Sequence, residues 1–124
     1  MKINEVAKLL HTSAWTLRYY EQVGVIAPIA RTKGNRDYLA TDVTQVRRVL
    51  DLRRCGLTLE EIKRLVHLRA TTGTASIQQQ ILQTRAANLR HEITGLQSSL
   101  NRLDTKIMAI SVETSKELSG NGTN

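Results

Sequence analysis

The second half of the chain carries an uninterrupted apolar repeat that strongly limits the possible folds. Its members alternate spacings of four and three residues: Leu82, Ala86, Leu89, Ile93, Leu96, Leu100, Leu103, Ile107 and Ile110. This spacing is typical of a coiled-coil seam, which at 1.5 Å per residue would extend over roughly 40 Å of helix. No other segment carries a matching stripe, so the sequence argues against an intramolecular hairpin and predicts that these residues form a dimer interface.

The repeat does not decide whether the two helices run parallel or antiparallel. With Leu82 at position d, the d positions hold mainly leucine and the a positions hold Ala, Ile, Leu and Ile, a combination that favours parallel dimers. The flanking positions are too neutral to decide the orientation; the e positions are Gln83, Arg90, Gln97 and Asp104, and the g positions are Arg85, Glu92, Ser99 and Lys106.

Upstream of the repeat, the sequence predicts two short helices followed by a wing. Apolar spacing indicates a first helix over Ile3 to Leu10, and Ser13 is a strong N-cap for a second helix that ends near Gln22. We interpret His11, between them, as a turn residue in the left-handed region rather than as a ligand. The helical period is then lost, and Lys33-Gly34-Asn35 predicts the turn of a small β-hairpin.

Two further helices are expected before the repeat. Thr41 or Asp42 is predicted to cap the third, which ends at Gly56. Its inward face is predicted to be Val43, Val46, Val49, Leu50 and Leu52. Thr58 and Glu61 form the capping box of the fourth helix.

Charge and composition narrow the class of protein. The net charge is +7, and residues 1 to 70 carry 13 of the 18 basic side chains against 7 of the 11 acids, which points to nucleic acid or an anionic membrane surface. No apolar run approaches the length of a membrane span, and the single cysteine agrees with a reducing compartment, so we expect a cytoplasmic protein that does not enter membranes. Catalytic triads, phosphate loops and metal-ligand spacings are absent, so neither an enzyme nor a cofactor or metal site is expected.

A longer motif identifies a family. Thr16-Leu17-Arg18-Tyr19-Tyr20-Glu21 is followed by Gly24, Pro28, Arg31, Gly34, Arg36 and Tyr38, with the spacing T-x-R-x-Y-E-x-x-G-x-x-x-P-x-x-R-x-x-G-x-R-x-Y. This pattern resembles the MerR family of bacterial transcription regulators, and the likeness runs from Ile3 to about Ala70. The long terminal helix is also similar to the family's.

The resemblance implies a mainly α protein with a winged helix-turn-helix domain at 1–70, a linker at 71–76, a coiled-coil dimerisation helix at 77–112 and a flexible tail at 113–124. It implies an antiparallel homodimer that binds double-stranded DNA at a pseudo-palindromic promoter site. Family members distort the promoter spacer so that its elements line up for RNA polymerase.

The second helix of a helix-turn-helix enters the major groove, and wings contact the flanking phosphates. We therefore predict these DNA-binding residues: Trp15, Arg18, Tyr19, Tyr20, Lys33, Arg36, Tyr38, Arg53 and Arg54. Trp15 is expected either to cover a thymine methyl group or to pack on the wing, and Tyr20 is the tyrosine more suited to the core. Tyr38 is expected to bind a phosphate or to brace the wing, and Asp37 is expected to orient Arg36.

Cys55 is a candidate redox sensor. The aldehyde- or thiol-responsive branch of the family carries a cysteine where this chain has Asp51, and Cys55 lies one helical turn later, beside Arg53 and Arg54. That offset argues against a sensing role. Two other functions stay open at this point: an effector-independent architectural DNA-binding protein, and a coiled-coil interaction module without a role on DNA.

Overall fold

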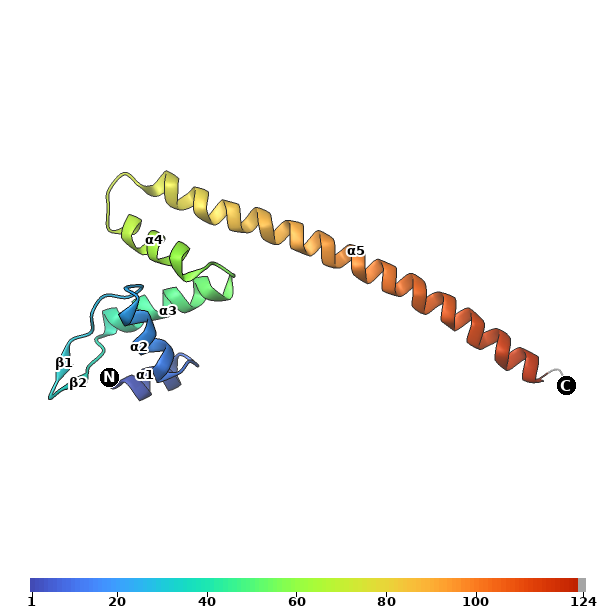
Figure 1. Ribbon diagram of the computed structural model, residues 1–124, viewed down its shortest axis with the longest axis horizontal. Helices are drawn as coiled ribbons and strands as arrows, with labels where there is room; N and C mark the ends of the chain where they lie inside the picture. Colours follow the sequence, from blue (N-terminus) through green and yellow to red (C-terminus); the bar gives the residue numbers. More distant parts are fainter. Residues whose placement is uncertain (123–124) are drawn as a thin grey trace. The chain divides into compact units, whose positions relative to one another are not determined.

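The computed structural model describes residues 1–122 and divides the chain into two compact units, Met1–Arg85 and the part that begins at Ala86. We call the first unit the head. It contains four helices, a two-stranded hairpin and the start of the long helix α5 (Figure 1). The predicted mainly helical fold, a helix-turn-helix with a small wing followed by one long helix, is confirmed.

The helix-turn-helix consists of α1, Ile3–Leu9, and α2, Ala14–Gln22. The Oγ atom of Ser13 accepts the amide hydrogen of Thr16 at 3.0 Å, so the predicted N-cap is confirmed. His11 has a φ angle of 55°, which confirms it as a left-handed turn residue.

The wing is an antiparallel hairpin of β1, Arg31–Thr32, and β2, Asn35–Arg36. Its turn residues Lys33 and Gly34 have φ angles of 53° and 80°. Two successive positive φ angles match the right-handed twist of paired strands, which is why a two-residue turn suits this hairpin. The hairpin extends away from the helices of the head (Figure 1).

Helix α3, Ala40–Arg54, begins earlier than predicted. Leu39 is its N-cap, and neither Thr41 nor Asp42 occupies that position. Asp42 lies in the first turn, where its carboxylate accepts the amide hydrogen of Leu39 at 2.8 Å. The carboxylate therefore satisfies an end-of-helix donor from inside the helix instead of from the cap.

Gly56, with a φ angle of 87°, follows the C-terminal end of α3 as predicted. Helix α4, Leu59–Arg69, then starts at the predicted capping box: Thr58 Oγ1 accepts from the Glu61 amide at 3.1 Å, and Glu61 Oε1 accepts from the Thr58 amide at 3.0 Å.

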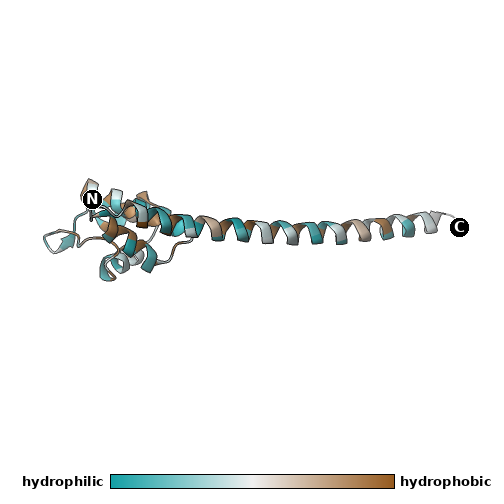
Figure 2. Cartoon of the chain, turned by 90° about the horizontal axis from the view of Figure 1, so that it is seen from above, coloured by the Kyte–Doolittle hydropathy of each residue, from teal (hydrophilic) through white to brown (hydrophobic). Residues whose placement is uncertain are grey.

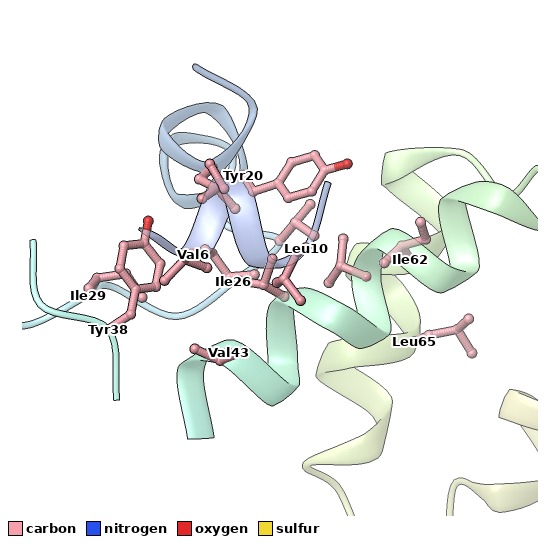
Figure 3. Packing of buried hydrophobic residues seen from close by; sticks show 14 of the residues in the cluster. Val6, Leu10, Tyr20, Ile26, Ile29, Tyr38, Val43, Ile62 and Leu65 are labelled. Carbon is pink, nitrogen blue, oxygen red and sulfur yellow. The ribbon is translucent and has the colours of Figure 1, made fainter. Parts of the chain in front are cut away.

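The core of the head is built from side chains of all four helices and of the loop before the wing (Figure 3). Val43, Val46 and Val49 are buried as predicted, and Leu50 and Leu52 pack partly buried against them. Ile81 of α5 also packs against this core, which explains why the start of the long helix belongs to the head.

Helix α5, Ala75–Gly122, continues past residue 112, where the sequence predicted that the helix would give way to a loose tail. Residues 113–122 are helical, and the remainder of the predicted tail, 123–124, lies outside the described residues. Hydrophobic residues recur along α5 beyond the head (Figure 2). Seven of the nine seam residues are exposed, Leu96 most of all at 71%, whereas Ala86 and Leu89 are half-buried. Among the described residues, no helix is long and apolar enough to cross a membrane.

Candidate nucleic-acid interface

Helix α2 presents a pair of stacked aromatic rings. Trp15 and Tyr19 lie one turn apart, with ring centroids 5.5 Å apart and an angle of 5° between the planes. Both rings are exposed, Trp15 at 69%. The indole of Trp15 therefore rests on Tyr19. Its packing on the wing stays a prediction. Contact with a thymine methyl group stays a prediction.

Arg18, between these rings in the sequence, borders a hollow of about 270 Å³ in which α1, α2 and the wing meet. We call it the cationic hollow; its lining is Lys2, Ile3, Asn4, Arg18, Arg31, Gly34, Asn35 and Arg36. Four of these side chains are cations and none is an acid. The arrangement concentrates positive charge on a concave surface, as a phosphate-binding site requires. Lys2 and Arg31 also line this hollow, although neither was among the predicted DNA-binding residues and Arg31 belongs to the motif.

Arg36 lies at this hollow but is held by an acid on α2. Its Nε atom donates to Glu21 Oε1 at 2.7 Å, and the two side chains are 21% and 16% exposed. Glu21 Oε2 also accepts the amide hydrogen of Ile29 at 3.3 Å. The prediction that Asp37 orients Arg36 is wrong, because Asp37 instead accepts from Thr32 and from the amino group of Met1.

The electrostatics of Glu21 follow from these contacts. Partial burial acts to raise the pKa of the Glu21 carboxyl, but the hydrogen bonds from Arg36 and from the Ile29 amide outweigh it. The net result is a pKa below the ordinary value, so the carboxylate stays charged and keeps Arg36 in place.

Two of the predicted DNA-binding tyrosines lie in the core. Tyr20 is 6% exposed and Tyr38 is 2% exposed, and Figure 3 shows both rings among the apolar side chains. Burial raises the pKa of both hydroxyls, and nearby arginines, Arg53 for Tyr20 and Arg36 for Tyr38, partly oppose the shift. A surface role for Tyr20 is not supported by this position. Tyr38 packs in the core of the head, where its buried hydroxyl has no hydrogen-bond partner among residues 1–122.

The remaining predicted DNA-contacting residues differ in whether their side chains are exposed or already hydrogen-bonded within the head. Lys33 is exposed at the tip of the wing, and Arg54 is exposed at the end of α3. Arg53 is partly committed to the fold, since its Nη1 atom donates to the carbonyl of Leu57 at 2.7 Å. Arg53 therefore stabilises the turn between α3 and α4 as well as contributing charge there.

Cys55 has an exposed thiol at the same turn. Its carbonyl oxygen accepts from Arg85 Nε of α5 at 2.8 Å, a contact over thirty residues that the sequence did not reveal. A Cβ atom added to Gly56 would collide with the Arg85 guanidinium, so the absence of a side chain at this position makes room for Arg85. The redox role of Cys55 stays a prediction.

Comparison with known proteins agrees with this geometry. Residues 1–68 match the family model described as MerR HTH family regulatory protein, and residues 43–106 match the model described as MerR, DNA binding. The chain is 34% identical over 107 residues to the HTH-type transcriptional regulator HmrR of Rhizobium leguminosarum bv. viciae, covering 83% of each. It is 31% identical over 109 residues to the regulator ZntR of Escherichia coli (strain K12), covering 83% of this chain and 77% of ZntR.

Solved structures show the same fold. A crystal structure from Listeria monocytogenes, assigned to the MerR family, superposes with a TM-score of 0.80 and 30% identity over 99% of this chain and 97% of that one. HiNmlR, described as a MerR family regulator lacking the sensor domain and bound to promoter DNA, gives a TM-score of 0.70 with 24% identity over 86% of both chains.

Proposed function

Since this chain belongs to the MerR family of helix-turn-helix transcriptional regulators, whose members bind promoter DNA as dimers, we propose that the cationic hollow and the Trp15–Tyr19 pair form its DNA-contacting surface. The protein is a DNA-binding transcription regulator and not an enzyme. The residues that contact DNA, the helix orientation in the dimer and the mode of control are the new parts of this proposal.

The observation that carries the proposal is the composition of the hollow. Arg18 from α2 and Arg31 from the wing share one concave surface with Lys2, and no acid lines it. An arginine on a recognition helix can place two parallel donors on a guanine edge or on a phosphate. Lys33 at the wing tip is suited to a phosphate beside the groove, which would position the protein without reading sequence.

In this proposal the role of Arg36 is to hold the wing in place. Its ion pair with Glu21 fixes the wing against α2, so that Arg18 and Arg31 are held at a constant separation. Tyr38, two positions after β2, supports the same arrangement, because its ring is buried in the core of the head. Preorganised contacts lose less entropy on binding than mobile ones.

We further propose that two copies bind a pseudo-palindromic site as an antiparallel dimer in the cytoplasm, and distort the promoter spacer for RNA polymerase. HiNmlR, bound to promoter DNA, and EcmrR, described in an EcmrR–DNA complex within EcmrR-RPo, share the fold and support this reading. An effector-independent mode of action is the second candidate, because the chain matches 86% of a regulator described as lacking the sensor domain.

The test is a salt titration of DNA binding by fluorescence anisotropy, with duplexes selected from a random pool. Affinity should fall with a log-log slope of about −5 to −8, since two heads would each release several counterions. A flat salt response would contradict the proposed interface. An interaction module without a DNA role should bind neither selected nor random duplexes.

A further inference from the structure

The flanks of the exposed α5 seam carry charges that can be compared between possible pairings of two copies. With Leu82 at position d, Arg85, Glu92, Lys106 and Glu113 occupy g positions. Arg90 and Asp104 occupy e positions. Charges at e and g set orientation and register in coiled coils, so each arrangement can be judged by the pairs it creates.

A parallel pair is disfavoured by these charges. In parallel coils a g position faces the e position five residues further along the other helix. Arg85 of each copy would then face Arg90 of the other. No opposite charges would meet in return, because Glu92 would face Gln97, and Lys106 would face Ser111.

Antiparallel pairs place a opposite d, g near g and e near e, and several registers keep the seam apolar. When Ile93 faces Leu96 of the second copy, Arg85 lies near Lys106, a pair of like charges. Shifting by one heptad so that Ile93 faces Leu89 brings Arg90 near its own equivalent and Glu92 near its own.

Among the registers with three or more distinct apolar layers, one gives only opposite charges. When Ile93 faces Leu103 of the second copy, the flanking pairs are Arg85 with Glu113, Arg90 with Asp104, and Glu92 with Lys106. Two-fold symmetry makes each pair occur twice. Four distinct layers of the seam are apolar, Ala86–Ile110, Leu89–Ile107, Ile93–Leu103 and Leu96–Leu100, and Leu82 faces Thr114 at each end. A shift by one further heptad, with Ile93 opposite Ile110, would bring Glu92 near Glu113.

We propose that two copies of this chain pair antiparallel in the register that places Ile93 opposite Leu103, specified by the charge pairs Arg85–Glu113, Arg90–Asp104 and Glu92–Lys106. The proposal rests on the proposed function for the existence of the dimer. It is independent of which residues contact DNA.

The continuation of α5 to Gly122 is needed for this register. Glu113 lies just beyond the predicted end of the dimerisation helix, and it is part of a regular helix here. Its partner Arg85 donates its Nε hydrogen to the Cys55 carbonyl at the turn between α3 and α4. A guanidinium carries five donors, so one side chain can contact this turn and also a carboxylate of the second copy. The register of the dimer would therefore be connected to the head through Arg85.

The first experiment is disulfide trapping of the full chain in a Cys55→Ser background, which removes the only native thiol. Bridged Cβ atoms must lie about 3.8 Å apart, so only facing residues cross-link efficiently. Ala86→Cys with Ile110→Cys should give a covalent dimer under mild oxidation. Ala86→Cys with Leu103→Cys, which face each other in the register with Ile93 opposite Leu96, should not. A covalent dimer from Ile110→Cys alone would indicate parallel helices and overturn the proposal.

The second experiment swaps charges and measures the dimer Kd by sedimentation. Arg90→Asp and Asp104→Arg should each weaken the dimer by about five- to thirtyfold, since two attractive pairs become repulsive. The double variant should return to within about threefold of the parent. Arg102→Asp, at an exposed c position, is the matched control and should have little effect. Double-variant losses that simply add would overturn the register.

The two proposals can fail separately. If the parent dimerises and binds promoter DNA but the Ala86–Leu103 variant is the one that cross-links, only the register is wrong. If the parent shows no salt-sensitive DNA binding, the proposed interface is wrong, and the cross-links still decide the register.

Discussion

Arg36 Nε lies 2.7 Å from Glu21 Oε1, and this ion pair joins the wing to helix α2. The two residues are 15 positions apart in the chain, and the side chains of Arg36 and Glu21 are only 21% and 16% exposed. A charge-assisted hydrogen bond in such a setting is stronger than an exposed surface pair.

Glu21→Gln should therefore destabilise the head by about 1 to 2 kcal/mol, because the arginine loses its charged partner in a partly buried place. Urea unfolding followed by circular dichroism measures the change. Glu60→Gln, at an exposed position of α4, is the matched control and should have little effect. Equal stability of the two variants would show that the ion pair contributes nothing.

The same carboxyl predicts a pH dependence. The pKa of Glu21 is lowered below 4.5 in the folded chain, so its stabilisation is present above the unfolded pKa and is lost as the pH falls through the folded one. The free energy of unfolding should decrease below about pH 4.5, and the gap between parent and Glu21→Gln should close there. Asp37 and Glu61, whose pKa values are also lowered, add to the decrease in both proteins. A gap that persists in acid would contradict this assignment.

Arg18 and Lys33 should differ in their effect on sequence discrimination. Arg18→Ala should cost roughly 1 to 3 kcal/mol of binding and relax discrimination at one operator position, if this side chain reads a base. Lys33→Ala should weaken all duplexes alike and reduce the salt slope. Anisotropy titrations against single-base operator variants make the comparison. Equal losses on every duplex for both variants would assign Arg18 to a phosphate.

Leu96→Asp tests the seam without touching the head. Leu96 is 71% exposed in a single chain, so the head should fold normally while the charge disrupts the dimer. Loss of simultaneous binding to two half-sites should reduce DNA affinity by about two to four orders of magnitude. Sedimentation and anisotropy together report both effects. A variant that still dimerises with normal DNA affinity would show that the seam lies elsewhere.

Gly56→Ala tests the close approach of Arg85 to the turn after α3. A Cβ atom would be strained by the φ angle of 87° and would also meet the Arg85 guanidinium. Gly34→Ala is the matched control, because its φ angle of 80° imposes similar strain while its Cβ would meet nothing within 4 Å. Both should lose about 1 kcal/mol from backbone strain, and Gly56→Ala should lose more. Thermal unfolding of the two variants, with and without Arg85→Ala, measures the additional loss of stability in Gly56→Ala. An equal loss of stability in the two variants would mean that Arg85 simply moves aside.

Local features were predictable because they depend on neighbours in the chain. The caps at Ser13 and Thr58, the left-handed turn at His11 and the hairpin turn at Lys33-Gly34 each follow from the preferences of a few adjacent residues. The first residue of α3 was missed because its N-cap, Leu39, has no side chain that can cap a helix; Asp42 in the first turn instead accepts the amide hydrogen of Leu39. The end of α5 was missed because loss of the apolar seam removes a partner surface, not helix propensity, and Glu113, Lys116 and Leu118 are good helix formers.

The sequence by itself determined the order of the elements, the apolar stripe of α5 and the cationic character of the head, since periodicity, capping and charge depend on the order of residues along the chain. Only the tertiary structure decided the partner of Arg36, the burial of Tyr20 and Tyr38, and the contact from Arg85 to the Cys55 carbonyl. The two contacts join residues up to thirty positions apart, and the burial of the two tyrosines depends on which face of an element is covered. They are set by how the helices pack, because a motif specifies which residues are present but not which of several nearby charges each one meets.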